Sequence, residues 1–69
     1  MLYTVRLRLS QDGLIDAMSD MRVWLDRQGY EPDLFQYRMD ADGAVLRVDF
    51  KFESKAFAFA EAFDGSLVR

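Results

Sequence analysis

The sequence predicts an α+β fold, a two-layer plait with the element order β-α-β-β-α in which both helices cover one face of the sheet. Three observations lead to this prediction. Apolar and polar residues alternate in three segments, apolar residues recur at helical spacing in two others, and an Asp-Gly pair separates the last two alternating segments. The order is ferredoxin-like, with a last strand that is short or missing. At 69 residues, the chain is expected to form a single domain, 1–69.

The first predicted strand covers residues 2–9, LYTVRLRL. Its apolar side consists of Tyr3, Val5, Leu7 and Leu9. Because successive side chains of a strand point to opposite faces, Thr4, Arg6 and Arg8 are expected on the other side of the sheet. Alternation with β-branched and aromatic members is typical of a strand that is buried on one face only.

The first predicted helix follows the sequence SQDG, where Ser10 or Asp12 is expected to cap it. One face at helical spacing consists of Leu14, Ala17, Met18, Met21, Trp24, Leu25 and Gln28. Gly29 is suited to the left-handed conformation that ends many helices, so we expect Tyr30 to fold back on Leu25 in a Schellman motif.

The second and third predicted strands, residues 34–39 and 45–53, form a hairpin closed by Asp42-Gly43. Closure at that turn places Met39 opposite Leu46, Tyr37 opposite Val48 and Phe35 opposite Phe50. Each apolar residue then meets another on the face that is expected to be buried, as a stable register requires. Phe52 has the same inward parity.

The segment SKAFAFAEAF, residues 54–63, has phenylalanines at the strand period and alanines that favour a helix. Ser54 is a suitable N-cap and Gly65 a suitable terminal glycine, and no turn residue follows Glu53, so we predict a helix. Its buried stripe is Ala56, Phe59, Ala60 and Phe63. Phe57 lies about 100° away from Ala56, so it either covers the edge of the core or is exposed.

The order of these elements also predicts the sheet. The right-handed crossover rule places the first and third predicted strands side by side and parallel, with the hairpin partner outside the third. Leu67 and Val68 are expected to form a short fourth strand beside the first.

The composition excludes several kinds of chemistry. The sequence has no cysteine and no histidine, so it offers no disulfide, no cysteine zinc site and no usual nucleophile–base pair. The segment DADG, 40–43, lacks the later ligands of a calcium loop, and the aspartates at 12, 16 and 20 fit a solvated helix face. We therefore expect no cofactor, no metal and no enzymatic activity. No run approaches the roughly 18 apolar residues of a membrane span, and a cytoplasmic location is expected.

The predicted plait leaves one sheet face without helices. The residues that point there are Thr4, Arg6, Arg8, Gln36, Arg38, Val45, Arg47, Asp49, Lys51 and Glu53. Five of the nine basic residues lie on this face with two acidic ones, a net charge of about +3. The rest of the chain then carries about −6, so the formal net charge of −3 conceals a polarised molecule.

Three interpretations fit this basic face. Charged side chains keep an open sheet face soluble, and that alone explains them. Alternatively, the face docks a protein partner or a second copy of the chain in a homodimer. The binding residues would then be Arg6, Arg8, Arg38, Arg47 and Lys51, with Phe57 as a hydrophobic anchor at a separate edge.

The third interpretation is weak binding of nucleic acid through phosphate contacts from the same arginines. Two observations count against it. The outward positions hold no aromatic residue on which a base could stack, and the net charge is negative. The sequence therefore favours a protein-binding or self-association module.

Overall fold

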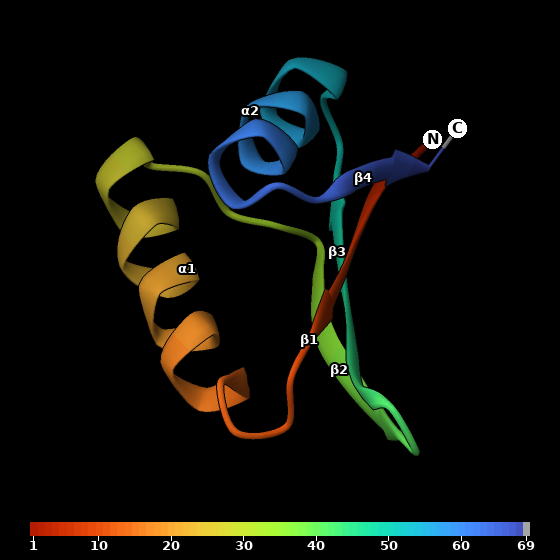
Figure 1. Ribbon diagram of the computed structural model, residues 1–69. Coiled ribbons are helices and arrows are strands. Elements are labelled where there is room, and N and C mark those ends of the chain that lie inside the picture. Colours follow the sequence, from red (N-terminus) through yellow and green to blue (C-terminus); the bar gives the residue numbers. More distant parts are fainter. Residues whose placement is uncertain (69) are drawn as a thin grey trace.

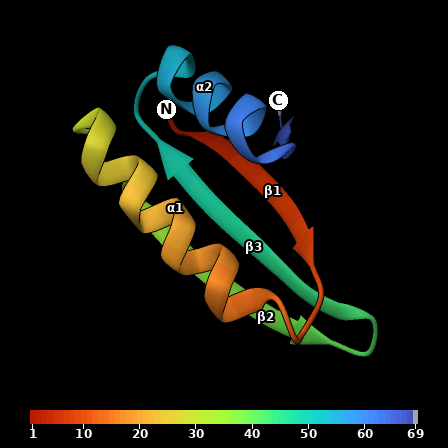
Figure 2. The same cartoon turned by 60° about the vertical axis from the view of Figure 1, so that its left-hand side comes forward.

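The computed structural model describes residues 1–68 and contains two layers, a four-stranded sheet and a pair of helices on one of its faces (Figure 1). In chain order the elements are β1 (Tyr3–Leu9), α1 (Leu14–Gln28), β2 (Leu34–Asp40), β3 (Gly43–Phe50), α2 (Glu53–Phe63) and β4 (Ser66–Val68). The predicted α+β plait is confirmed, and so is the short fourth strand beside β1. Figure 2 shows α1 running along β2, with α2 beside β1.

The strand order is β2-β3-β1-β4, and every neighbouring pair is antiparallel. The prediction that β1 and β3 are neighbours is therefore confirmed, but the prediction that they are parallel is wrong. The helical crossover through α1 makes β1 and β2 point the same way, and β3 returns through a tight turn and enters the sheet between them. A strand in that position runs opposite to both of its neighbours.

The hairpin turn lies one residue earlier than predicted, which shifts the register between β2 and β3 by two residues. Asp40 pairs with Gly43, so Ala41 and Asp42 form the turn and Met39 lies opposite Ala44 rather than Leu46. The side-chain oxygen of Asp40 accepts a hydrogen bond from the backbone N–H of Asp42 at 2.9 Å, which favours this turn. Because the shift is an even number of residues, each side chain keeps its predicted face.

Gly43 also has a role that the turn prediction did not include. Its φ of 143° lies in a region that side chains rarely adopt, and a Cβ there would collide with the carbonyl oxygen of Leu9 in β1. Glycine therefore allows the hairpin to lie against the end of β1.

The start of each helix differs from its prediction. Gly13, rather than Ser10 or Asp12, is the N-cap of α1, although the hydroxyl of Ser10 accepts a hydrogen bond from the Gly13 N–H at 3.1 Å. Phe52, rather than Ser54, is the N-cap of α2, since β3 ends at Phe50. Phe52 is consequently exposed instead of pointing inward from a strand.

The two helix ends use left-handed residues. At the end of α1, Gly29 has a φ of 70° and the Tyr30 N–H donates to the carbonyl of Leu25 at 3.0 Å, so the predicted Schellman motif is confirmed. At the end of α2 the left-handed residue is Asp64, with a φ of 58°, and the prediction of Gly65 is wrong by one position.

Gly65 is used for close packing instead. A Cβ on Gly65 would lie 2.9 Å from Leu7 and 3.0 Å from Val5. The absence of a side chain therefore lets the chain pass directly over β1 as it leaves α2 and enters β4.

The core lies between the two layers and includes side chains from β1, α1, β3 and α2. The fully buried members with the largest side chains are Phe50, Phe59, Met21, Leu46, Val5 and Val48. Trp24 joins the helices, because its ring makes edge contacts with Tyr30, Phe59 and Phe63 at centroid distances of 5.7 Å. Of the predicted buried stripe of α2, Ala56, Phe59 and Ala60 are buried and Phe63 is partly buried. Gln28, predicted on the buried face of α1, is exposed.

Candidate functional site

The face of the sheet opposite the helices is open, and five basic side chains are exposed on it or at its margin. They are Arg6, Arg8, Arg38, Arg47 and Lys51. Glu53, which was predicted to share this face, instead lies in the first turn of α2. Asp40 occupies an outward position of β2 in its place, so the balance of five basic and two acidic residues is unchanged. The predicted polarity of the molecule is therefore retained.

Four of the arginines line one hollow of the open face. The register places Arg6 directly opposite Arg47, while Val45 of β3 lies between Arg8 on β1 and Arg38 on β2. These side chains surround a hollow of about 430 Å³, which we call the arginine hollow. Its lining residues are Arg6, Arg8, Gln36, Tyr37, Arg38, Asp40, Val45 and Arg47. Its charge is concentrated, because four guanidinium groups are held by three adjacent strands.

Arg47 is fixed by a buried carboxylate. Its Nε and Nη2 donate to the two oxygens of Asp49 at 3.1 and 3.0 Å, and the Thr4 hydroxyl donates to the same carboxylate at 2.7 Å. Asp49 is only 1% exposed. Burial alone would raise the pKa of Asp49, but the hydrogen bonds from Arg47 and Thr4 and the charge of Arg47 outweigh it, so the pKa is lowered. The Asp49 carboxylate therefore stays ionised and fixes the orientation of the Arg47 side chain. With its lowered pKa it is not suited to act as a general base.

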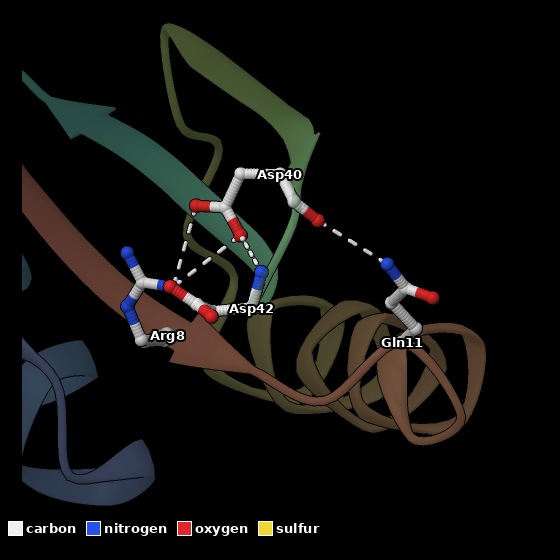
Figure 3. Close-up of polar contacts among 4 residues, drawn as sticks. All are labelled: Arg8, Gln11, Asp40 and Asp42. Carbon is white, nitrogen blue, oxygen red and sulfur yellow. Dashed lines mark hydrogen bonds and ion pairs between the residues drawn. The ribbon is translucent and has the colours of Figure 1, made fainter.

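Arg8 is paired with Asp40 across the sheet (Figure 3). Its Nη1 lies 3.3 Å from one oxygen of Asp40, and Gln11 donates to the Asp40 backbone carbonyl at 3.2 Å. Desolvation would raise the pKa of Asp40, yet the Asp42 N–H and Arg8 more than offset it and lower the pKa. These contacts tie the hairpin to the end of β1 and fix one wall of the arginine hollow.

The other two arginines of the hollow are different. Neither Arg6 nor Arg38 has an ion-pair partner among residues 1–68. Arg6 faces the like charge of Arg47 across the β1–β3 pair, an arrangement that is unfavourable in an isolated sheet. The hollow therefore contains guanidinium groups whose donors are available to an external anion.

Two predicted binding residues do not belong to this group. Lys51 follows β3 at the far end of the sheet face, where its Nζ lies 4.0 Å from a carboxylate oxygen of Asp33. Phe57 is 51% exposed and lies on α2, in the helical layer. The alternative that Phe57 is exposed is thus the observed one, but Phe57 and the arginine hollow are separate surfaces.

The sequence interpretation missed the part played by Asp40. Its outward parity on β2 and its position three residues before Gly43 were the signals that could have placed it on the open face within reach of Arg8. The pairing of Thr4 with Asp49 was also missed, although both were predicted to point outward. Within residues 1–68, no group of three acidic side chains is arranged to hold a metal ion.

Neither α1 nor α2 has the length and hydropathy that a helix needs to cross a bilayer. Comparison with protein-family models, with curated proteins and with solved structures found no match for this chain. The ferredoxin-like assignment accordingly stays a prediction.

Proposed function

We propose that the chain is a protein-binding module and that its open sheet face docks an acidic segment of a partner protein. The observation that carries the proposal is the arginine hollow, which four arginine side chains line together with Val45 and in which two of them, Arg6 and Arg38, lack an ion-pair partner within residues 1–68. Carboxylates placed between Arg6 and Arg47 would accept hydrogen bonds from both and reduce their mutual repulsion.

The expected affinity is low. Exposed ion pairs contribute only about 0.2–1 kcal/mol each, so even four of them at the upper end correspond to a Kd no tighter than about 1 mM. Contacts that the partner segment makes with the apolar side chain of Val45, and through its own backbone, would add to this affinity. Because the attraction is mainly between exposed charges, binding is expected to weaken steeply as salt increases. Such binding suits a reversible regulatory contact.

An acidic protein segment suits this face better than a nucleic acid does. Tyr37 is the one aromatic residue that lines the hollow within residues 1–68, and its strand position directs it toward the helical layer. The remainder of the molecule, with four basic and ten acidic residues, would repel a long phosphate backbone. A short acidic segment can stay within the basic face.

The proposal assigns this face to a foreign partner. A second copy could present the acidic side of α1, but a contact between two different surfaces is heterologous and would continue into open chains unless the rotation happened to close. We also propose a cytoplasmic location, with which a sequence free of cysteine is compatible. The proposed binding requires no catalytic step.

The test is fluorescence anisotropy with a labelled peptide of about ten residues rich in Asp and Glu, a neutral peptide of equal length, and a random single-stranded RNA. We expect binding of the acidic peptide at about 50 mM NaCl, with loss at about 500 mM. Arg6→Gln should weaken it severalfold, whereas Arg27→Gln, which removes an equal charge from α1, should not. RNA bound more tightly than the peptide would favour the nucleic-acid alternative. Equal effects of the two variants would contradict a site at the hollow.

A further inference from the structure

The edge of the sheet formed by β2 is unpaired within residues 1–68. β2 bonds to β3 along seven consecutive residues without a bulge, and its other side has no strand neighbour. Alternate residues of such a strand direct backbone N–H and C=O groups away from the sheet. Natural proteins usually block long edge strands with proline, lysine, bulges or short length. β2 has no proline, lysine or bulge, and its charged residues, Arg38 and Asp40, point to the open face of the sheet, whereas the opposite edge, β4, has only three residues.

Apolar side chains border this free edge. Tyr37 and Met39 point toward the helical layer, yet they are 51% and 47% exposed. Of the inward side chains of β2, only Phe35 is partly buried against the core, and the Arg22 guanidinium lies over its ring at 4.8 Å from the centroid. Ile15 is 79% exposed and precedes Arg22 by two helical turns, which places it on the same side of α1. The strip beside β2 is thus apolar and uncovered in the isolated chain.

We propose that a second copy of this chain pairs along β2, so that the two sheets join into one antiparallel eight-stranded sheet. The two-fold axis would pass through Tyr37, the midpoint of Leu34–Asp40, because only that axis pairs all seven strand residues. An isologous contact of this kind closes on itself and leaves no further β2 edge exposed. The proposal is independent of the proposed docking of acidic segments.

The pattern of β2 is complementary to itself in this register. Phe35 lies opposite the partner's Met39, and Tyr37 lies opposite the partner's Tyr37, so apolar and aromatic side chains meet on the helical side. On the open side Arg38 lies opposite the partner's Gln36, and no like charges are directly opposed. An axis at Arg38 would oppose two arginines and pair fewer residues. This self-complementarity favours a second copy over a foreign strand.

Two physical consequences follow for the strength of the dimer. The strip is narrow in comparison with the roughly 1,200–2,000 Å² that stable interfaces bury, so association is expected to be weak and concentration-dependent. The partner's Arg38 would lie diagonally across from Arg38, about 7–8 Å away, and would join the two arginine hollows on one face. Because salt screens this repulsion, dimerisation should strengthen with salt, whereas docking of an acidic segment should weaken.

The test is sedimentation equilibrium of the full chain from about 10 μM to about 1 mM, at about 50 mM and about 500 mM NaCl. We expect the mean mass to rise toward that of a dimer, and to rise further at high salt. Tyr37→Lys should weaken association at least about tenfold. Phe57→Lys is the matched control, since Phe57 is also 51% exposed but lies on α2, and it should leave association unchanged.

Amide hydrogen exchange of the unmodified chain provides a second readout that needs no variant. Protection of the β2 amides should increase with protein concentration while protection in β4 stays constant. A chain that remains monomeric at the highest concentration, or a dimer equally sensitive to Tyr37→Lys and Phe57→Lys, would overturn the proposal. So would concentration-independent exchange along β2.

Discussion

Replacement of Asp49 by asparagine tests how the open face is held together. The carboxylate is buried and accepts two hydrogen bonds from Arg47 and one from Thr4. Asparagine keeps one oxygen, which can still accept from Thr4, but it loses the charge and the paired contact with Arg47. Hydrogen bonds to a charged group contribute about 1.5–3 kcal/mol, and water can replace part of this contact because Arg47 is nearly half exposed.

We therefore expect Asp49→Asn to reduce the free energy of unfolding by about 2 kcal/mol. For a domain of this size, that loss corresponds to a fall in Tm of about 8–16 °C. Urea denaturation followed by circular dichroism measures the first quantity, and a thermal scan the second. Asp20→Asn, on the exposed side of α1, is the control and should change stability by less than about 0.5 kcal/mol.

The same variant has an expected effect on binding. Asp49→Asn releases Arg47 and removes one negative charge from the open face. The acidic peptide should therefore bind more tightly, even though the free energy of unfolding is lower. A stability change no larger than that of Asp20→Asn would refute the assigned contact between Asp49, Arg47 and Thr4. Tighter binding by Asp20→Asn than by Asp49→Asn would refute the local origin of the attraction.

Three further predictions concern pH and backbone geometry. Since the pKa of Asp49 is lowered in the folded chain, its contribution to stability is complete above the ordinary value of 3.8 and is lost as pH falls toward the lowered pKa; acid titrations of unfolding should show a smaller loss in Asp49→Asn. Gly43→Ala forces an unfavourable φ and a clash with Leu9, so urea denaturation should show a loss of more than about 2 kcal/mol, and an ordinary surface-sized effect would contradict the turn geometry. Asp64→Gly should stabilise the chain by about 0.5 kcal/mol because Asp64 is left-handed, and a destabilised variant would argue against that conformation.

Much of the fold could be predicted because each element has its own period. Alternation in residues 3–9 correctly separated Val5 and Leu7 from Arg6 and Arg8, and helical spacing correctly placed Met21 and Leu25 in the core. The outward direction of the arginines followed from the same alternation. What failed was the relation between elements, since parallel β1 and β3 were predicted from a crossover rule that does not account for a strand inserted between β1 and β2.

Local contacts that the sequence pattern does not reveal explain the remaining errors. The hairpin register was two residues off because the Asp40 side chain bonds to the Asp42 N–H, and an Asp-Gly pair alone does not reveal which residues form the turn. The sequence also could not show that Tyr37 and Met39 remain half exposed although they point toward the helical layer. Their exposure depends on how closely α1 packs against β2, which the period of either segment does not reveal.

The candidate site was predictable only in part. The alternation of each strand placed four arginines on one face. That they lie together and away from Lys51 follows only from the register in which β1, β3 and β2 pair. That Arg8 is already paired could not be read from the sequence, because Asp40 lies on β2 and Arg8 on β1. The Arg47–Asp49 contact joins two outward residues of the same strand, and only the structure shows that Asp49 is buried beneath it. The distinction between paired and available arginines is what separates a docking surface from a face that is merely solvated.

The proposed function requires that an acidic segment of a partner protein binds at the arginine hollow. Its most direct test is a ¹⁵N–¹H correlation spectrum of the labelled chain, recorded while the acidic peptide is added at low salt. We expect progressive shifts for the amides of Arg6, Val45 and Arg38, with those of α1 and α2 unchanged. Shifts confined to the helices, or a spectrum unaffected by peptide in large excess, would contradict it.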